Sequence, residues 1–301
     1  MLPLVPLALF LLEWLVCFFF GMQLFGDTAM HRLGELTVCV LLWMGWVRLA
    51  SVTFSFAIAS RLNSPPTRQR VLPRLKTIAF ETGAAFIAFS FLIPLKWLFA
   101  PRLKQAPQPG STIILLVHGL ISNSGIWWLF ARRMRKLHQA LIDSVDLGPP
   151  FQSIDLAADR LNRKLRELEA LKPARIILIG HSMGGLVARA CLQKHPSALV
   201  EQVFTLGTPH CGSLSALVLP FTNLIQMRPS SAWLKHLAGV EAVYAGRPVP
   251  MTSIYSRHDN LVIPYGNGFL EGSVAVESVG VGHLSLLFDA KICGDIAQRI
   301  G

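Results

Sequence analysis

The chain is poor in charged residues, and especially in acids. Charged side chains make up 15% of its 301 residues, with 17 acids against 28 lysines and arginines. A typical soluble domain carries about 25% charged residues, so this composition excludes an ordinary soluble protein, and the mean hydropathy of +0.48 agrees. The net charge of +11 is spread over helix faces and one loop, so we expect no nucleic-acid partner.

Cysteine is scarce as well. The five cysteines are scattered along the chain and form no C-x-x-C pair: Cys17, Cys39, Cys191, Cys211 and Cys293. This spacing excludes a disulfide framework and a cysteine-based metal site, although a single disulfide stays open. We therefore treat the cysteines as small apolar residues.

Apolar residues concentrate before residue 101. Three runs, at about 2–25, 36–60 and 77–100, contain few charges, and each is long enough to cross a bilayer, which needs about 20 helical residues. We expect an uncleaved membrane anchor over residues 1–104 with three transmembrane helices, because the first run lacks the basic start of a signal peptide. The alternative is three buried helices of a soluble protein.

Charges near this anchor predict its orientation. Residues 61–76 carry five basic residues and no acid, whereas the loop at 26–35 is near neutral. Basic loops stay cytoplasmic, so the chain after residue 100 is predicted on the opposite side, although Arg102 and Lys104 oppose this. Glu13 and Arg48 lie near the midpoints of their spans, and we hypothesise that they pair.

The most informative pattern is G-x-S-x-G at Gly180–Gly184. An apolar run typical of a buried strand, Arg175–Ile179, leads into it, and a helix-like segment, Leu186–Lys194, follows. This is the pattern of a nucleophile elbow, in which a tight strand-to-helix turn exposes the serine hydroxyl. The sequence therefore predicts Ser182 as a nucleophile that attacks an acyl carbonyl.

Further strands and helices alternate around this elbow. After a linker at 105–110, strands are expected at 111–117, 199–206, 249–255 and 273–281. Alternation of this kind is typical of a parallel sheet with helices on both faces. One helix is expected to bury a leucine stripe made of Leu156, Leu161, Leu165, Leu168 and Leu171. The apolar segment 213–246 is either a cap over the site or an extra packing helix.

Chain order limits the partners of Ser182. In the elbow architecture an Asp or Glu follows the serine, and the His follows the acid. Asp259, directly after a predicted strand, and His283, after the last one, fit this order. The other possible acids are Glu201, Glu241, Glu271 and Glu277, none of which follows a strand as suitably.

An oxyanion hole needs two backbone N–H donors. Met183, which follows the nucleophile, supplies one, and Leu120, in the loop after the first strand, supplies the other. Gly119 would let that loop turn tightly. The substrate pocket is expected to involve residues that shape the surrounding loops: His118, Gly119, His181, His210 and Trp127.

Together these residues resemble the α/β-hydrolase superfamily, in particular its bacterial lipases and esterases. The resemblance covers residue 111 to the end. It is carried by five short motifs: His118–Gly119, Gly180–Gly185, Leu206–His210, Ser256–Asp259 and Gly282–His283. It implies an α/β fold with a mostly parallel sheet, in a compact version without the first antiparallel strands. It also implies cleavage of carboxylic esters through an acyl-enzyme, without metal or cofactor.

The anchor and the resemblance combine into one expectation. We expect a membrane-anchored serine hydrolase (domain 111–301) that cleaves lipid or long-chain acyl esters, in a bacterial inner membrane with this domain on the periplasmic side. Its partners would be the lipid substrate and the bilayer. An acyltransferase or thioesterase with the same triad, and a non-catalytic membrane scaffold, stay open because fold does not decide function.

Overall fold

The computed structural model describes residues 29–63, 69–103, 107–108, 110–243 and 249–300. Its centre is a six-stranded sheet in the order β2-β1-β3-β4-β5-β6, and every pairing of neighbouring strands is parallel. The strands are β1 Thr112–Val117, β2 Leu141–Val145, β3 Arg175–His181, β4 Val200–Leu206, β5 Met251–Ser256 and β6 Val274–Ser278. The expected parallel sheet is therefore confirmed.

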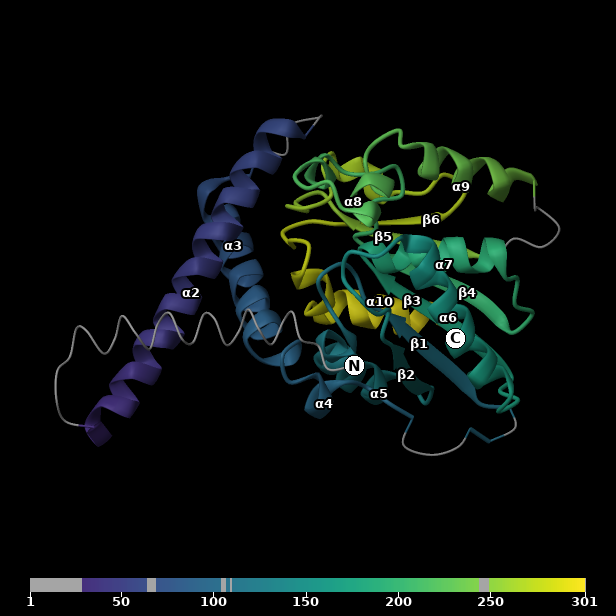
Figure 1. Cartoon of the computed structure of the whole chain (residues 1–301), viewed down its shortest axis with the longest axis horizontal. Helices are drawn as coiled ribbons and strands as arrows, with labels where there is room; N and C mark the ends of the chain where they lie inside the picture. Colours follow the sequence, from purple (N-terminus) through teal and green to yellow (C-terminus); the bar gives the residue numbers. More distant parts are fainter. Residues whose placement is uncertain (1–28, 64–68, 104–106, 109, 244–248, 301) are drawn as a thin grey trace.

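Helices cover both faces of this sheet (Figure 1). Helices α5 (Trp128–Leu137) and α10 (Ala290–Ile300) pack on one face, and α6 (Ile154–Glu169) and α7 (Met183–Lys194) pack on the other. Alternate residues of the strands point to opposite faces, so β1 to β5 each contribute to two apolar clusters, whereas the edge strand β6 contributes only Val276, to the cluster under α5 and α10. We call the part made of residues 110–300 the α/β body.

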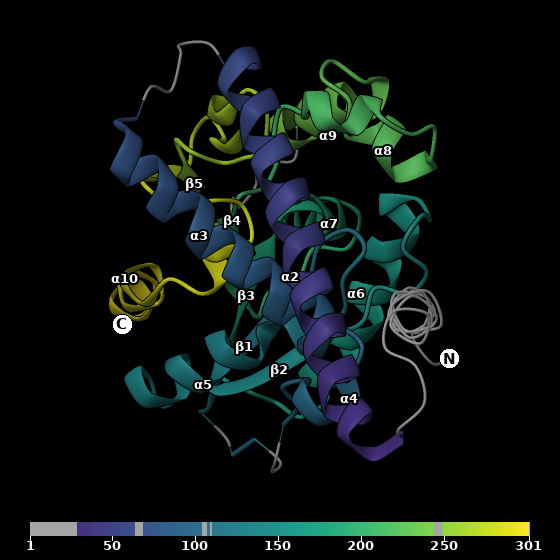
Figure 2. The same ribbon diagram turned by 90° about the vertical axis from the view of Figure 1, so that its left-hand side faces the viewer.

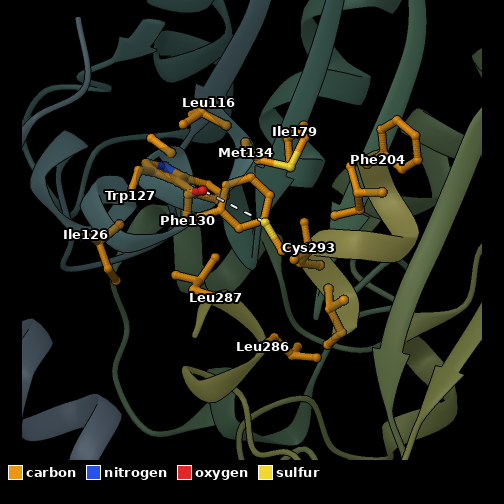
Figure 3. Close-up of a cluster of buried hydrophobic side chains, with 14 of the residues drawn as sticks. Leu116, Ile126, Trp127, Phe130, Met134, Ile179, Phe204, Leu286, Leu287 and Cys293 are labelled. Carbon is orange, nitrogen blue, oxygen red and sulfur yellow. Dashed lines mark hydrogen bonds between the residues drawn. The ribbon is translucent and has the colours of Figure 1, made fainter. Parts of the chain in front are cut away.

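The cluster under α5 and α10 shows how this alternation builds the core (Figure 3). Leu116, Ile179 and Phe204 come from neighbouring strands and meet Phe130 of α5 and Cys293 of α10. All five side chains are buried, and the Cys293 thiol lies 3.8 Å from the carbonyl oxygen of Phe130. Burial raises the pKa of this thiol to about 11, so it stays protonated, as a small apolar residue.

Two elements differ from the sequence-based expectation. β2 was not expected, because Asp143 and Ser144 interrupt its apolar residues at the edge of the sheet. The prediction that α6 buries a leucine stripe was wrong at both ends of the stripe. Leu156 is 55% exposed, Leu171 lies beyond the end of α6 and is 42% exposed, and the buried face instead includes Ala157 and Ala158. Leu161 comes five positions after Leu156, and a step of five leaves the helix face.

Two long helices precede the α/β body. Helix α2 spans Ala29–Leu62, and α3 (Val71–Ile87) continues as a π-helical turn η1 (Ala88–Leu92). Within them, 37–62 and 71–92 are long and apolar enough to cross a membrane, judged by length and composition only. The expected first span, 2–25, lies outside the described residues, as does Glu13. Arg48 lies over the ring of Phe89, 5.6 Å from its centroid.

The expected third span, 77–100, was wrong in its bounds. The helix begins at Val71 and ends at Leu92, and a turn separates it from the short helix α4 (Lys96–Phe99). Pro94 lies in that turn, where its missing N–H and fixed φ interrupt a helix. Residues 71–99 thus form two pieces, and α4 contacts the α/β body through the salt bridge from Lys96 to Asp146.

The two long helices lie side by side along one flank of the α/β body (Figures 1 and 2). Elsewhere, the segment 213–246 contains the 3-10 turn η3 (Leu214–Leu217) and helices α8 (Thr222–Gln226) and α9 (Ala232–Val243). Asn223 of α8 reaches Met183, with 3.6 Å between its Nδ2 and the sulfur. This segment therefore lies next to the start of α7. Of the linker expected at 105–110, residues 105–106 and 109 lie outside the described residues.

Candidate active site

Ser182 occupies a strained turn between β3 and α7. Its backbone has φ 56° and ψ −128°, a combination that costs a non-glycine residue free energy and that concentrates at functional sites. The Ser182 N–H donates to the carbonyl of Leu206, at 2.8 Å, which fixes the turn to β4. A Cβ on Gly184 would collide with the carbonyl oxygens of Val117 and His118, so α7 can start this close to β1 only with glycine there.

Asp259 and His283 form a buried pair beside this turn. Nδ1 of His283 lies 2.9 Å and 3.1 Å from the two carboxylate oxygens of Asp259. The backbone N–H groups of Leu261 and Val262 donate to Oδ1 of Asp259, each at 2.8 Å. Burial alone would lower the pKa of His283, but the charge and hydrogen bond of Asp259, and the charge of Glu81, raise it. The pair is thus arranged to favour a charged imidazole.

Two contacts bring this pair close to Ser182. Nε2 of His181, the residue before the serine, donates to the carbonyl oxygen of His283 at 3.1 Å, and the two imidazole rings lie 4.8 Å apart. A Cβ on Gly207, after β4, would lie 3.1 Å from Oδ2 of Asp259 and 3.2 Å from Nδ1 of His283. The three residues singled out from sequence therefore gather where β3, β5 and β6 end.

The loop after β1 lies on the other side of the serine. A Cβ on Gly119 would lie 2.8 Å from Cβ of Ser182, so Leu120 and Met183, the two expected oxyanion donors, flank the nucleophile. His118 supports this loop: its Nδ1 lies 2.9 Å from the carbonyl oxygen of Gly119, and its Nε2 accepts from the N–H of Leu147. Burial lowers the pKa of His118. The ring therefore stays neutral, and its Nε2 can accept the hydrogen bond from Leu147.

The other expected pocket residues lie inside the protein. His210 bridges Arg189 and Thr205, at 3.2 Å and 2.9 Å. Burial and the nearby Arg189 charge hold the pKa of His210 well below its usual range. Trp127 is fully buried, with its ring edge-on to His181. Their contacts therefore support the loops around the site.

Residues that the sequence did not single out also touch the His283 loop. Asn260 Oδ1 accepts from the N–H of His283 at 3.0 Å, and Glu81 of α3 accepts from the next two N–H groups. The signal for Glu81 was its isolation, because a lone acid in an apolar helix implies a buried partner. Asn260 offered no signal beyond its place next to Asp259.

No metal centre is evident in the part of the chain that the structure describes. No group of three or more His, Cys, Asp or Glu side chains there is arranged to hold a metal ion. The four described cysteines, Cys39, Cys191, Cys211 and Cys293, are free thiols. The chemistry that these residues can support is that of a serine, an imidazole and a carboxylate.

Comparisons with known proteins agree with this fold. The family model described as PGAP1-like alpha/beta domain matches residues 151–227, which include the elbow. A Gibberella zeae protein described as an AB hydrolase superfamily protein is 25% identical over 215 residues, which are 65% of this chain and 73% of that one.

Solved lipases share the fold. The mature Bacillus licheniformis lipase BlEst2 superposes with a TM-score of 0.54 at 19% identity, over 67% of this chain and 94% of that one. Aspergillus fumigatus lipase B gives 0.53 at 16% identity, over 79% and 77%. The chain belongs to the α/β-hydrolase superfamily.

Further relatives of this α/β hydrolase match over shorter stretches. A lysosomal thioesterase PPT2 homolog of Drosophila melanogaster is 29% identical over 117 residues, which are 37% of this chain and 41% of that protein. A triacylglycerol lipase of Pseudarthrobacter phenanthrenivorans is 35% identical over 109 residues, 33% of this chain and 34% of that one. The chain thus spans less than half the length of either relative, one of which is named a thioesterase and the other a lipase.

Proposed function

We propose that the protein is a serine hydrolase that cleaves carboxylic esters with the triad Ser182, Asp259 and His283. The single observation that carries this proposal is the buried hydrogen bond of 2.9 Å between Asp259 and His283, next to a serine on a strained elbow. An acid that holds the imidazole in one orientation is what a histidine base needs in order to activate serine.

The reaction then follows in two halves. His283 removes the proton from Oγ of Ser182 as that oxygen bonds to the acyl carbon, and the N–H groups of Leu120 and Met183 stabilise the oxyanion. The intermediate collapses as His283 gives the proton to the leaving alcohol, which leaves an acyl-serine. Water repeats the sequence and releases the acid. Neither half requires a cofactor.

The substrate that we propose is a lipid or another long-chain acyl ester. Exposed apolar side chains cluster in the segment 213–246, where Leu217, Val218 and Ile225 face solvent. Phe221 of the same segment stacks on Phe151, with ring centroids 4.0 Å apart. Because this segment also touches Met183, we propose that it caps the site and receives an acyl chain.

We also propose that α2 and α3 attach the hydrolase to a membrane through their exposed faces, since their opposite faces pack along the α/β body. Many apolar residues of these helices stay exposed, where they could meet lipid: Val38, Leu42, Trp43, Trp46, Phe54, Leu72, Leu75 and Phe91. By the charge bias of residues 61–76, the hydrolase domain (111–301) would lie on the non-cytoplasmic side, which in a bacterial inner membrane is the periplasm. Exposed Cys211 can be tested for labelling by an impermeant maleimide in sealed vesicles of known orientation, with Cys211→Ser as the control.

Labelling with a fluorescent fluorophosphonate in isolated membranes tests the nucleophile. Wild type should be labelled, Ser182→Ala should not, and Ser197→Ala, which removes a hydroxyl bound to Glu169, should be labelled like wild type. Absence of labelling in a folded wild type would favour the non-catalytic scaffold. Turnover of short water-soluble esters only, in the presence of lipid vesicles, would remove the lipid substrate from the proposal.

The second candidate function is thioester cleavage or acyl transfer by the same triad. The chain is 29% identical to a thioesterase homolog over 117 residues. This similarity is the reason to test the second candidate function. Matched oxyester and thioester substrates with one acyl chain would rank the two hydrolytic activities. Addition of an alcohol acceptor, followed by product analysis, would separate transfer from hydrolysis.

A further inference from the structure

The loop that carries His283 is held from outside the α/β body. The carboxylate of Glu81, in the middle of α3, accepts two backbone hydrogen bonds. Its Oε1 accepts from the N–H of Leu284 and its Oε2 from the N–H of Ser285, both at 2.8 Å. Only 1% of Glu81 is exposed. These N–H groups open the short 3-10 turn η5 (Ser285–Leu287), where free N–H groups favour a negative charge.

Helix α2 reaches the same loop through one intermediate. Asn260 accepts from the N–H of His283 with its Oδ1 at 3.0 Å and donates with its Nδ2 to Oγ of Ser55 at 2.8 Å. Ser55 in turn donates to the carbonyl of Val52, at 2.7 Å. Because an amide presents its oxygen and nitrogen on opposite sides, the bond to Ser55 fixes the side that faces His283.

These contacts exceed what anchoring requires. Apolar packing alone would attach two helices to the body. Here Glu81 of α3 accepts directly from the N–H groups of residues 284 and 285, and Ser55 of α2 binds Asn260, which accepts from the N–H of residue 283. A buried carboxylate is costly unless it is satisfied, so its placement at this loop calls for a specific benefit.

We infer that α2 and α3 are part of the catalytic apparatus, with Glu81 and, through Asn260, Ser55 acting as positioning residues for His283. This inference rests on the proposed function, in which His283 is the base. The helices hold the backbone on both sides of the imidazole, so that its ring stays aligned between Asp259 and Ser182.

If Glu81 positions His283, its charge should also affect the pKa of His283, an effect that apolar packing of α3 would not produce. Burial opposes the ionised form of Glu81, but its two oxygens each accept a backbone hydrogen bond at 2.8 Å, which favours that form. Asp259 and the ionised Glu81 both face His283 and favour its charged form. The third group beside it, His181, stays neutral, because burial and then the charge of His283 hold its pKa well below the usual range. Removal of the Glu81 charge should therefore lower the pKa of His283.

The test uses the full chain in detergent or nanodiscs with 4-nitrophenyl butyrate, a soluble ester that avoids effects of lipid binding. Glu81→Gln should lower kcat at least about tenfold, with KM within about twofold, and should move the acid limb of kcat/KM to lower pH. Ser55→Ala should lower kcat by a smaller factor. Ser60→Ala is the matched control, because its hydroxyl bonds only to its own helix, at Ala57.

A second measurement does not depend on activity. Hydrogen exchange at residues 283–285 should be faster in Glu81→Gln and Ser55→Ala than in wild type and Ser60→Ala. If a folded Glu81→Gln has the kcat, pH profile and hydrogen exchange of wild type, the inference is overturned. The helices would then serve only as an anchor. If Glu81→Gln does not fold, Ser55→Ala decides by the same readouts. Failure of the proposed function has a different result, in which wild type and Ser182→Ala are equally inactive while the exchange difference persists.

Discussion

Gly119 approaches Ser182 so closely that a Cβ on the glycine would lie 2.8 Å from Cβ of the serine and 3.0 Å from the carbonyl oxygen of His181. Gly119→Ala must therefore move either the elbow or the loop that carries Leu120. Since one misplaced oxyanion donor costs about 10²–10³ in kcat, we expect a loss of that size in ester turnover, with little change in KM.

A second glycine supplies the control for this prediction. Gly294 lies in α10, outside the proposed cap, and a Cβ there would meet nothing within 4 Å. Gly294→Ala should keep wild-type turnover and raise the free energy of unfolding by about 0.5–1 kcal/mol, as alanine does in a helix. Wild-type kcat in a folded Gly119→Ala would show that this loop does not supply a donor.

Replacement of Asp259 tests the acid of the triad. In Asp259→Asn an amide faces Nδ1 of His283, which no longer has two carboxylate oxygens as partners. We expect kcat to fall by about 10³–10⁴, the scale of a base held in the wrong tautomer. The measurement is steady-state turnover together with the melting temperature, because Asp259 also binds two backbone N–H groups.

Asp289→Asn is the matched variant for that substitution. Asp289 accepts from the N–H groups of Lys291 and Ile292 at the start of α10, a role that asparagine performs about as well. Turnover should therefore stay at the wild-type rate. An equal loss of kcat in both variants would point to a general effect of lost carboxylates and count against a triad role for Asp259.

The sequence was sufficient for the parallel sheet and the elbow, because both depend on local patterns. The run Arg175–Ile179 and the spacing of Gly180, Ser182 and Gly184 predict a strand, a turn and a helix from neighbouring residues alone. Chain order then singled out Asp259 and His283, which the structure brings within hydrogen-bonding distance.

Contacts between segments that are distant in the chain could not be predicted from the sequence. Glu81 and Ser285 are separated by more than 200 positions, and nothing in the apolar run around Glu81 indicates which backbone groups it meets. The same holds for Ser55 and Asn260. An edge strand such as β2, with Asp143 in its middle, fails for another reason: its alternation is too short to separate from a loop.

The salt bridge between Lys96 and Asp146, at 2.6 Å, predicts a pH-dependent stability. Burial would raise the pKa of Asp146, but the hydrogen bonds from Lys96 and the Ser124 N–H outweigh it and lower the pKa from 3.8 to about 2. A lowered pKa stabilises the fold above the unfolded value and loses this effect as pH falls. The destabilisation by Asp146→Asn should thus shrink between about pH 4 and pH 2.

A double-mutant cycle isolates that interaction. Lys96→Met, Asp146→Asn and the double variant are unfolded by denaturant at pH 7 and at pH 2.5. The coupling free energy between the two residues should be measurable at pH 7 and smaller at pH 2.5. The same coupling at both pH values would mean that the charge on Asp146 is not what joins α4 to the loop after β2.

Gly282→Ala separates the contact of Glu81 from its charge. A Cβ at position 282 would lie 2.5 Å from Oε2 of Glu81 and 2.6 Å from its Cδ, so alanine should push the carboxylate off the N–H groups of Leu284 and Ser285 without removing it. We expect kcat to fall by a factor similar to that in Glu81→Gln, measured on the same soluble ester. The acid limb of kcat/KM should stay near the wild-type pH, because the negative charge remains close to His283.

Gly294→Ala in α10, where a Cβ would meet nothing within 4 Å, should leave both the rate and the pH profile unchanged. Combining Gly282→Ala with Glu81→Ala adds a further check, since residues that share one contact are not additive. With the carboxylate gone, the alanine at 282 has no Oε2 to displace, so the double variant should turn over about as fast as Glu81→Ala alone. Fully additive losses would mean that Gly282 and Glu81 act on His283 independently, and the loop would then have to be held by something other than α3.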